Sequence, residues 1–358
     1  MQALRAHIGG ARAGVAPSRR GGRRGLVARA SASPPPPFMP PQLSEIAEPA
    51  ARAMAARMRR VPVPLPSLGL DALPTAHVPP AGSHADRAAP PVVLLHGFDS
   101  SSLEMRRLHP LLEAEVEAHA VDLVGWGFTD HTPFAKDKDL RITPAQKREH
   151  LLNFWRDHVG RPMVLVGASL GGAIALEFAL EHPEAVERIV LIDAQGFIDG
   201  IGPMASLPRP LAAAGVWLLR TEGLRMAANR MAYRDQAFAT EDAMRVGRLH
   251  THLDGWTDAN VAFMRGGGYA ISSKLSRVQQ PVLVLWGRQD QILEPRYATQ
   301  FLETLPDARL RWLEDCGHCG HLEKPRETAD AILAFARGGE LEGALRAGDA
   351  VAAGAARR

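Results

Sequence analysis

The sequence predicts an α/β fold with a mostly parallel, doubly wound sheet and an inserted helical segment. Short apolar runs of strand length alternate with segments of helical periodicity between residues 91 and 339. Most of these runs are apolar at every position, which is typical of strands buried on both faces of a parallel sheet. One stretch, residues 198–275, contains helix-like segments and no convincing strand. Because it lies between two predicted sheet strands, it is expected to be an inserted helical cap.

Two segments of different character come before the sheet. Residues 1–33 are rich in arginine and alanine and contain no acidic residue. This composition is typical of an organelle transit peptide, without regular structure of its own. Residues 34–60 begin with a proline-rich spacer, which favours an extended chain, and continue into a predicted amphipathic helix at 43–60. Residues 61–90 are rich in proline and glycine, and we expect only weak, irregular strands there.

The main domain is expected to span residues 61–337. Strands are predicted within 91–102, 118–127, 162–169, 186–197, 281–290 and 308–318, and helices within 108–117, 143–160, 170–182 and 327–339. Thr143 is a suitable N-cap for the second of these helices, and Gly160 is a suitable end. The tail at 338–358 is rich in alanine and glycine and is expected to fray.

Composition and charge exclude several classes of protein. Charged residues make up 23% of the chain and hydrophobic residues 46%, as in ordinary globular proteins. No stretch reaches the roughly 18 uncharged apolar residues that a membrane-spanning helix needs. The net charge is +3, but residues 1–44 contain seven arginines and no acidic residue, so the remainder is near −4. The basic character therefore does not indicate a nucleic-acid surface on the folded part.

The segment "GASLG" at 167–171 is the most informative motif in the chain. It matches G-x-S-x-G and places Ser169 between the predicted strand "VLV" and the predicted helix "GGAIALEFAL". In this context the motif is a nucleophile elbow, a sharp turn that presents a serine above the strand ends. The positive end of the following helix favours negative charge that develops beside the serine. The alternative is a glycine-rich turn that carries an incidental serine.

A serine nucleophile needs a general base and an acid that orients the base. In this architecture they follow in the order serine, acid, histidine. Asp290 and His318 both lie just after predicted strands, in that order, where open α/β sheets form their sites. His321 is the rival base, and His96 is interpreted as a structural histidine. The reserve acids are Glu294, Glu314 and Asp315.

Two backbone N–H groups are expected to form the oxyanion hole. One belongs to Leu170, the residue after the nucleophile, and the other most simply to Phe98, in the loop that follows "VVLLHG". The mechanism calls for no metal and no organic cofactor.

These motifs resemble the serine-nucleophile branch of the α/β-hydrolase superfamily. The resemblance covers about residues 90–337, in "LLHGFDSS", "DLVGWGFTD", "GASLGG", "LWGRQD" and "CGHCGHLEKP". It implies the α/β-hydrolase fold, with Ser169, Asp290 and His318 as the triad. Family members usually carry a glutamate five residues after the catalytic histidine and a proline two further, and Glu323 and Pro325 fit His318. Dehalogenases and epoxide hydrolases of this fold are expected to carry aspartate at the elbow, so the serine implies acyl transfer to water.

The predicted cap is rich in large apolar side chains. Trp217, Met226, Trp256 and Met264 are the candidates to line a substrate pocket, although packing of the cap on the core is the commoner role. This composition favours a small apolar ester, thioester or ring-cleavage ketone as substrate. The alternatives are a cofactor-free lyase or acyltransferase on the same triad, or a catalytically silent ligand-binding protein.

Two further features complete the prediction. Cys316 and Cys319 surround His318 in "CGHCGH" and are interpreted as packed residues, with redox control or zinc binding as alternatives. The segment "LLHGFDSSSLE" is similar to plastid-targeted hydrolases of plants and algae. We therefore expect import into a chloroplast by the plastid import machinery, with the mitochondrion as the alternative.

Overall fold

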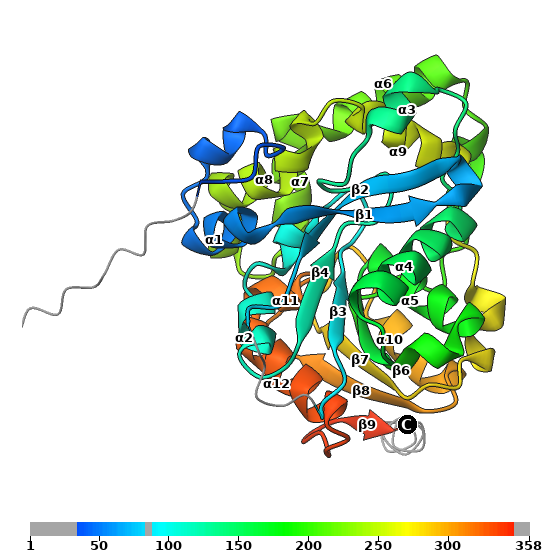
Figure 1. Cartoon of the computed structure of the whole chain (residues 1–358). Helices are drawn as coiled ribbons and strands as arrows, with labels where there is room; N and C mark the ends of the chain where they lie inside the picture. Colours follow the sequence, from blue (N-terminus) through cyan, green and yellow to red (C-terminus); the bar gives the residue numbers. More distant parts are fainter. Residues whose placement is uncertain (1–33, 83–87, 347–358) are drawn as a thin grey trace, which may run out of the picture. The chain divides into compact units, whose positions relative to one another are not determined.

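The computed structural model describes residues 34–82 and 88–346. These residues form a nine-stranded sheet with helices on both faces (Figure 1). The strands are β1 (Arg59–Leu65), β2 (Leu70–Val78), β3 (Val92–Leu95), β4 (Ala118–Val121), β5 (Met163–Ala168), β6 (Val186–Ile192), β7 (Val282–Gly287), β8 (Ala308–Leu313) and β9 (Leu345–Arg346). The predicted transit peptide at 1–33 and residues 347–358 of the predicted tail lie outside the described residues.

The strand order is β1-β2-β4-β3-β5-β6-β7-β8-β9. The six strands from β4 to β8 are parallel, and β1, β2 and β9 are antiparallel to their neighbours. The predicted α/β fold with a mostly parallel sheet is therefore confirmed. All six strands predicted within residues 91–318 are present.

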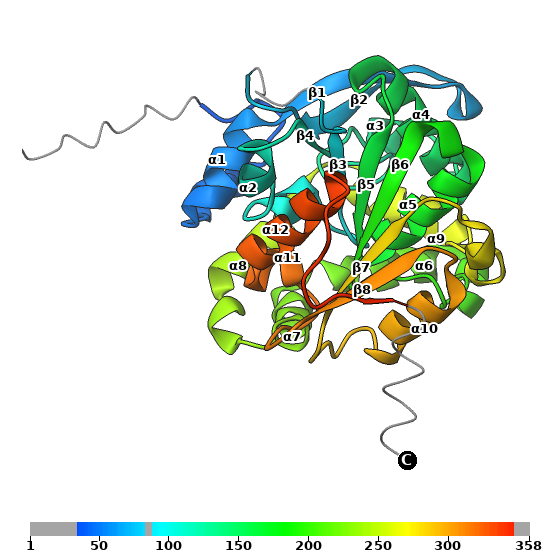
Figure 2. The same ribbon diagram turned by 90° about the horizontal axis from the view of Figure 1, so that it is seen from below.

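Helices cover both faces of the sheet (Figure 2). They are α1 (Pro49–Arg57), α2 (His109–Glu113), α3 (Thr132–Lys136), α4 (Pro144–His158), α5 (Leu170–Glu181), α6 (Arg209–Leu219), α7 (Glu222–Ala232), α8 (Glu241–Arg248), α9 (Trp256–Arg265), α10 (Arg296–Thr304), α11 (Gly320–Glu323) and α12 (Pro325–Ala336). Helices α4, α5 and α10 pack on one face, and α1, α2 and α12 pack on the other. The sequence of β3 is uniformly apolar because both faces of the strand are buried. Val93 and Leu95 pack in the core on one face of the sheet, and Val92 and Leu94 pack in the core on the other.

The proline-rich segment after residue 60 forms a hairpin of two strands that are longer than the weak strands that the sequence suggests. The expected irregularity is present as a register shift between Val63 and Leu65. Strands β1 and β2 pair antiparallel, with Pro62 opposite Pro74. Strand β1 is the edge of the sheet, so the missing N–H groups of its prolines remove no bond to a second neighbour. Two large apolar side chains of this hairpin, Val63 and Leu73, are buried in the core.

Both ends of the described chain also differ from expectation. The predicted helix at 43–60 is α-helical only at Pro49–Arg57, and its first residues belong to a separate 3-10 helix at Pro41–Glu45. Pro49 separates the two, because proline favours the first turn of a helix and disfavours a helical residue before it. Near the other end, Leu345 and Arg346 pair with β8. This part of the predicted tail therefore extends the sheet rather than fraying.

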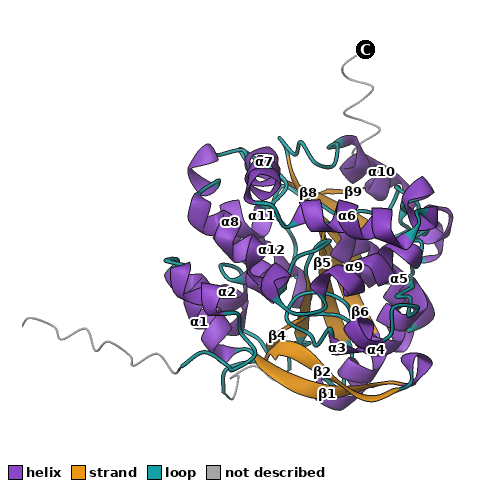
Figure 3. Ribbon diagram, turned by 90° about the horizontal axis from the view of Figure 1, so that it is seen from above, coloured by secondary structure: helices purple, strands orange, loops and turns teal. Residues whose placement is uncertain are grey.

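The segment between β6 and β7 contains α6, α7, α8 and α9 and no strand. We call these four helices and their connections the cap (Figure 3). Across both described ranges, no helix combines the length and the apolar character that crossing a bilayer requires.

Candidate active site

Ser169 lies at a strained turn between β5 and α5. Its φ is 51° and its ψ is −122°, a conformation that non-glycine residues rarely adopt. The flanking glycines make this turn possible. A Cβ atom on Gly167 would lie 2.3 Å from the carbonyl oxygen of Gly171, and a Cβ on Gly171 would lie 2.6 Å from that of Leu95. The sequence "GASLG" therefore folds as a strand–turn–helix elbow, as its pattern predicts.

Backbone hydrogen bonds hold the elbow against the end of the neighbouring strand β6. Ser169 N donates to Ile192 O at 3.0 Å, and Gln195 N donates to Ser169 O at 2.9 Å. The loop after β3 approaches from the other side, because a Cβ on Gly97 would lie 3.2 Å from Ser169 Cβ. The position of the serine is thus fixed by backbone on both sides.

Asp290 and His318 are brought together from the ends of two adjacent strands, β7 and β8. The Nδ1 of His318 donates to Oδ2 of Asp290 at 2.8 Å. The other carboxylate oxygen of Asp290 accepts from the N–H groups of Ile292 at 2.7 Å and Leu293 at 3.0 Å. The side chain of Asp290 is fully buried, and that of His318 is 11% exposed. This pairing fixes the imidazole through Nδ1 and leaves Nε2 for proton exchange.

Ser169 Oγ is not hydrogen-bonded to His318, nor to any other described residue. Hydrogen bonds between a nucleophile and its base are often long without substrate and tighten in the substrate complex. The three residues nevertheless follow the carboxyl ends of β5, β7 and β8, on one edge of the sheet.

The rival base, His321, has a different environment. Its Nε2 lies 3.1 Å from Oε1 of Glu104, and the ring is buried. Two of the reserve acids, Glu294 and Glu314, form exposed ion pairs with Arg296 and Arg288. Of the acids and histidines that the sequence offered for the triad, the structure pairs Asp290 with His318 by a hydrogen bond.

The two N–H groups predicted for the oxyanion hole belong to backbone segments next to Ser169. Leu170 is the first residue of α5, so its N–H has no partner within the helix. Phe98 directly follows Gly97, the residue packed on Ser169. Neither N–H donates a hydrogen bond to any described residue. Both groups are therefore available to a developing oxyanion.

His96 has the structural role that the sequence suggests. Its Nδ1 contacts Gly97 O at 2.8 Å, and its Nε2 lies 3.6 Å from Oδ1 of Asp122. Both the ring and the carboxylate are buried. The histidine holds the loop that carries Phe98.

A pocket of about 690 Å³ opens beside this edge, and its lining is mostly apolar. The core contributes Phe98 and Leu170, and the cap contributes side chains that include Val216, Phe263 and Met264. A volume of this size accommodates a drug-sized or lipid-like molecule. The lining of the pocket includes both residues proposed for the oxyanion hole, Phe98 and Leu170, but not Ser169, Asp290 or His318.

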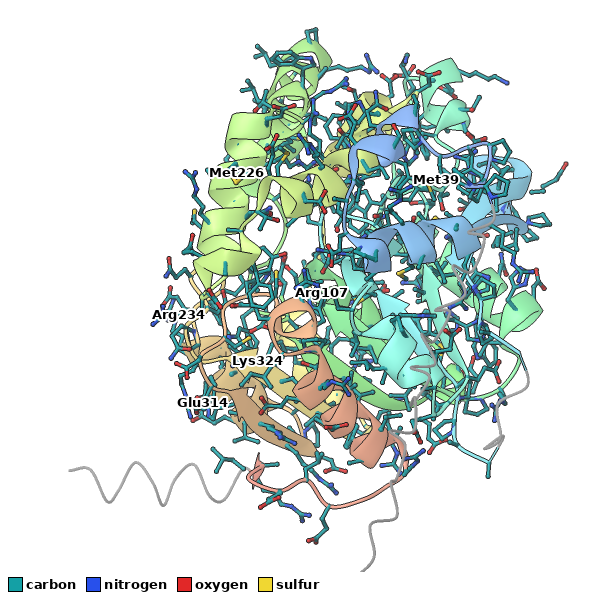
Figure 4. The ribbon with its side chains drawn as sticks, turned by 90° about the vertical axis from the view of Figure 1, so that its left-hand side faces the viewer. Met39, Arg107, Met226, Arg234, Glu314 and Lys324 are labelled. Atoms are coloured by element: carbon teal, nitrogen blue, oxygen red, sulfur yellow. The ribbon has the colours of Figure 1, made fainter. Side chains whose placement is uncertain are left out.

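Of the four cap residues predicted to line the pocket, the structure brings only Met264 there. Trp256 is buried and donates from Nε1 to Asp99 Oδ1 at 2.8 Å, so it packs the cap on the core. Trp217 is 55% exposed on α6, and Met226 lies on α7 away from the lining (Figure 4). The apolar lining comes instead from residues of smaller or less distinctive type, such as Ile198, Leu207 and Leu211.

The sequence analysis did not identify Asp193. This residue directly follows β6, the strand that lies in the sheet between β5, which precedes Ser169, and β7, which precedes Asp290. It is fully buried and has a φ of 44°. Its Oδ1 accepts from Gly287 N, the last residue of β7, at 2.7 Å. Burial raises its pKa well above the usual range, and the nearby charge of Asp290 raises it further. Its signal in the sequence is the aspartate of "LIDAQ" at a strand end, the same position that Asp290 and His318 occupy after their strands.

The role of Glu323 is a second feature that the sequence analysis did not identify, although the spacing of this residue from His318 fits the family pattern. Its Oε1 accepts from Gly317 N at 2.8 Å, and its Oε2 accepts from Arg234 N and Asp235 N at 3.0 Å each. The carboxylate therefore ties the histidine loop to the cap segment after α7, where Arg234 and Lys324 line one groove (Figure 4). His318 N also donates to Ala232 O at 2.7 Å.

The two cysteines near His318 are free thiols. Burial raises the pKa of both Cys316 and Cys319, so the reactive thiolate form is disfavoured. Within the described ranges, no three histidine, cysteine or carboxylate side chains gather closely enough to hold a metal ion.

Comparison with known proteins identifies the family of this chain. A family model described as the alpha/beta hydrolase family matches residues 92–331. The alpha/beta hydrolase domain-containing protein VTE7 of Arabidopsis thaliana is 39% identical over 306 residues, which cover 85% of this chain and 91% of the relative. A 2-hydroxy-6-oxononadienedioate/2-hydroxy-6-oxononatrienedioate hydrolase of Pseudomonas putida is 27% identical and is covered over 86% of its length, with 68% of this chain.

Solved structures show the same fold. A thermophilic esterase from Thermogutta terrifontis superposes with a TM-score of 0.63 and 20% identity, over 78% of this chain and 98% of that one. A serine hydrolase involved in carbazole degradation gives a TM-score of 0.61 and 24% identity, with the same coverage of the two chains.

Proposed function

Because the chain belongs to the alpha/beta hydrolase family, we propose that it is a serine hydrolase that cleaves an apolar carboxylic ester, a thioester or a related carbonyl compound. The observation that carries this proposal is the buried 2.8 Å bond between His318 Nδ1 and Asp290, at the sheet edge where the strained elbow presents Ser169. The relatives named above include hydrolases and an esterase, which supports the same class of reaction.

The proposed reaction proceeds through an acyl-enzyme. His318 Nε2 takes the proton of Ser169 Oγ as the oxygen attacks the substrate carbonyl. The N–H groups of Phe98 and Leu170 stabilise the negative charge on the carbonyl oxygen. His318 then gives its proton to the leaving group, and Asp290 stabilises the cationic ring. In the second half of the cycle, a water molecule gives a proton to His318 as its oxygen bonds to the acyl carbon. His318 then returns the proton to Ser169 Oγ as the bond between the serine and the acyl group breaks, which releases the acid.

The shape and chemistry of the pocket support an apolar substrate. Its lining is dominated by aliphatic and aromatic side chains and glycines, and it includes Phe98 and Leu170. An acyl or aromatic group can be buried there while the carbonyl reaches Ser169. A sugar or a phosphate would leave its polar groups without partners in such a lining.

Covalent labelling with a fluorophosphonate probe tests the proposal. We expect the parent chain to be labelled, and we expect Ser169→Ala and His318→Asn to abolish labelling, while folding is checked by circular dichroism. His321→Asn is the matched control and should keep most of the labelling. Absence of labelling in a folded parent, or equal labelling of the Ser169→Ala variant, would contradict the proposed chemistry.

The acceptor of the acyl group separates the related alternatives. With a labelled apolar ester, hydrolysis gives the free acid, and an acyltransferase gives a new ester when an alcohol is supplied. A ligand-binding protein without activity would bind the ester and release neither product. We expect the free acid in the presence and in the absence of an added alcohol.

We also propose that the arginine-rich segment before residue 34 directs the protein into a chloroplast. Its support is the composition of residues 1–33, which contain seven arginines and no acidic residue. A fluorescent protein fused after residue 44 is expected to enter plastids in plant or algal cells. Entry into mitochondria would instead support the other organelle address.

A further inference from the structure

Exposed apolar side chains are concentrated on one part of the cap. Of the ten large hydrophobic side chains that are strongly exposed in the described chain, eight lie between residues 198 and 231. They are Ile198, Met204, Leu207, Leu211, Trp217, Leu218, Leu224 and Met231. The remaining two, Phe98 and Ile292, lie elsewhere. Single exposed apolar residues are ordinary, but such a concentration marks an interaction surface.

Two helices present these residues at helical spacing. On α6 the exposed positions include Leu211, Ala214, Gly215 and Leu218, and on α7 they include Leu224, Ala227, Ala228 and Met231. Each set has the spacing i, i+3, i+4, i+7, which forms one continuous stripe along a helix. In a globular protein such a stripe normally faces the core, but α7 has no buried residue. We call the exposed stripes of α6 and α7 the outer cap face; Figures 1 and 3 show the two helices.

The charges around the outer cap face indicate what covers it. Residues 198–234 contain five arginines and two acidic residues. The carboxylate of Asp199 accepts hydrogen bonds from Ile271 N and from Ser272, and Glu222 pairs with Arg248. The side chains of Arg209 and Arg225 bind Asp258 and Asp99. Among the described residues, the other three, Arg220, Arg230 and Arg234, form no ion pair. A twofold contact between two copies of this face would place these cations in one interface, whereas anionic lipid headgroups would neutralise them.

The α6 stripe of the outer cap face reaches the pocket, because its Leu211 and Gly215 also line it. Ile198, Met204, Leu207 and Leu211 are strongly exposed and also line this pocket, together with Phe98 and Leu170. An apolar molecule could therefore pass from a lipid layer to the pocket along apolar side chains.

We propose that the outer cap face binds the surface of an anionic lipid layer, from which an apolar substrate enters the pocket. The second half of this statement rests on the proposed hydrolase function, and the first half does not. Trp217 and the apolar stripes enter the boundary between headgroups and acyl chains, as amphipathic helices do at membrane surfaces. Arg220, Arg230 and Arg234 contact the lipid phosphates or carboxylates.

The inner side of α7 connects this surface to both catalytic loops. Arg225 binds the side chain of Asp99 in the loop that carries Phe98, and its Nη1 also donates to Asp99 O at 3.2 Å. At the end of the same helix, Ala232 O accepts from His318 N at 2.7 Å. The helix that docks on lipid thus also contacts the loops of the oxyanion hole and of the general base.

Vesicle flotation of the full chain tests the docking surface without reference to catalysis. The vesicles are phosphatidylcholine alone, or phosphatidylcholine with about one third phosphatidylglycerol. The double variant Leu218→Gln/Met231→Gln removes one large side chain from each stripe, and Arg230→Gln removes one cation. Ile292→Gln is the matched control, since Ile292 is 41% exposed but lies outside the cap. The arginine-rich N-terminal segment is the same in every variant, so its contribution to binding cancels in the comparison.

We expect the parent to float with the anionic vesicles and the double variant to bind at least tenfold more weakly. Arg230→Gln should weaken binding only at low salt, because salt screens exposed charges. Binding of the parent and the double variant with equal affinity would overturn the proposal. Self-association of the parent that the double variant abolishes, without vesicle binding, would assign the face to a second copy. Fluorophosphonate labelling in the absence of vesicles should be unchanged in the double variant, which separates failure of docking from failure of the proposed chemistry.

Discussion

At the scale of single residues, Glu104 connects two loops of the candidate active site. Its Oε2 accepts from Gly97 N at 3.3 Å, and its Oε1 lies 3.1 Å from His321 Nε2. Burial by itself raises the pKa of Glu104, but the contacts with His321 and the charge of His96 lower it to about 2. The ionised carboxylate therefore stabilises the folded protein and holds the loop that precedes Phe98.

We expect Glu104→Gln to lower the free energy of unfolding by roughly 2–3 kcal/mol at pH 7. Because the folded-state pKa is depressed, this stabilisation is complete above the unfolded pKa of about 4.5 and is lost as the pH falls toward 2. The difference between parent and variant should therefore shrink between pH 5 and pH 3 in urea unfolding. A difference that is independent of pH would show that the carboxylate charge does not contribute.

At the scale of elements, strand ends and the loops that follow them build the candidate site. Gly287 ends β7, and a Cβ at this position would lie 1.9 Å from Gly317 O in the histidine loop. The close approach brings the loops of Asp290 and His318 together. Gly171 has the corresponding role at the start of α5, where the helix passes the carbonyl oxygen of Leu95.

We expect Gly171→Ala to destabilise the protein by about 2 kcal/mol or more, since backbone atoms must move to admit the new methyl group. The same change should abolish fluorophosphonate labelling by displacing Ser169. Gly215→Ala on α6 is the control, because a Cβ there meets nothing within 4 Å. Thermal unfolding and labelling of both variants check this expectation. Full labelling of Gly171→Ala would show that the elbow tolerates the methyl group.

At the scale of the whole folded unit, one buried carboxylate joins the cap to the core. Asp99 is 4% exposed and directly follows Phe98, one of the two residues proposed for the oxyanion hole. It accepts from Trp256 Nε1 at 2.8 Å, contacts His250 Nε2 at 3.2 Å and pairs with Arg225. Burial tends to raise its pKa, but the charge of Arg225 and the bonds from the cap lower it overall. These contacts link the position of the cap to that of Phe98.

We expect Asp99→Asn to cost about 3 kcal/mol of stability, because Arg225 is left without its counter-charge in a largely buried site. If Asp99 had a purely structural role, the substitution would lower stability and leave kcat and KM of the folded enzyme unchanged. A positioning role also lowers kcat for a long-chain ester more than it raises KM. The double variant Asp99→Asn/Arg225→Gln should recover part of both losses, and strict additivity in this cycle would argue against the coupling.

The sequence by itself determined the order of the parallel strands along the chain, the elbow at Ser169, and the choice of Asp290 and His318. These features depend on local patterns: apolar runs of strand length, glycines two residues from the serine, and polar residues directly after strands. The capping box of Thr143 and Gln146 is local in the same way.

Tertiary structure decided the rest, because it depends on which distant residues meet. Only the position of β1 at the sheet edge explains why a proline-rich segment forms a strand. The packing of α6, α7 and α9 decides which cap side chains face the pocket, and helical periodicity alone does not fix this packing. The four cap residues concerned are Trp217, Met226, Trp256 and Met264. The links from Asp99 to Arg225 and from Glu323 to Arg234 join residues 126 and 89 positions apart. No local pattern encodes such pairs. They contribute to stability only after folding has brought the two distant residues together and has buried them away from water.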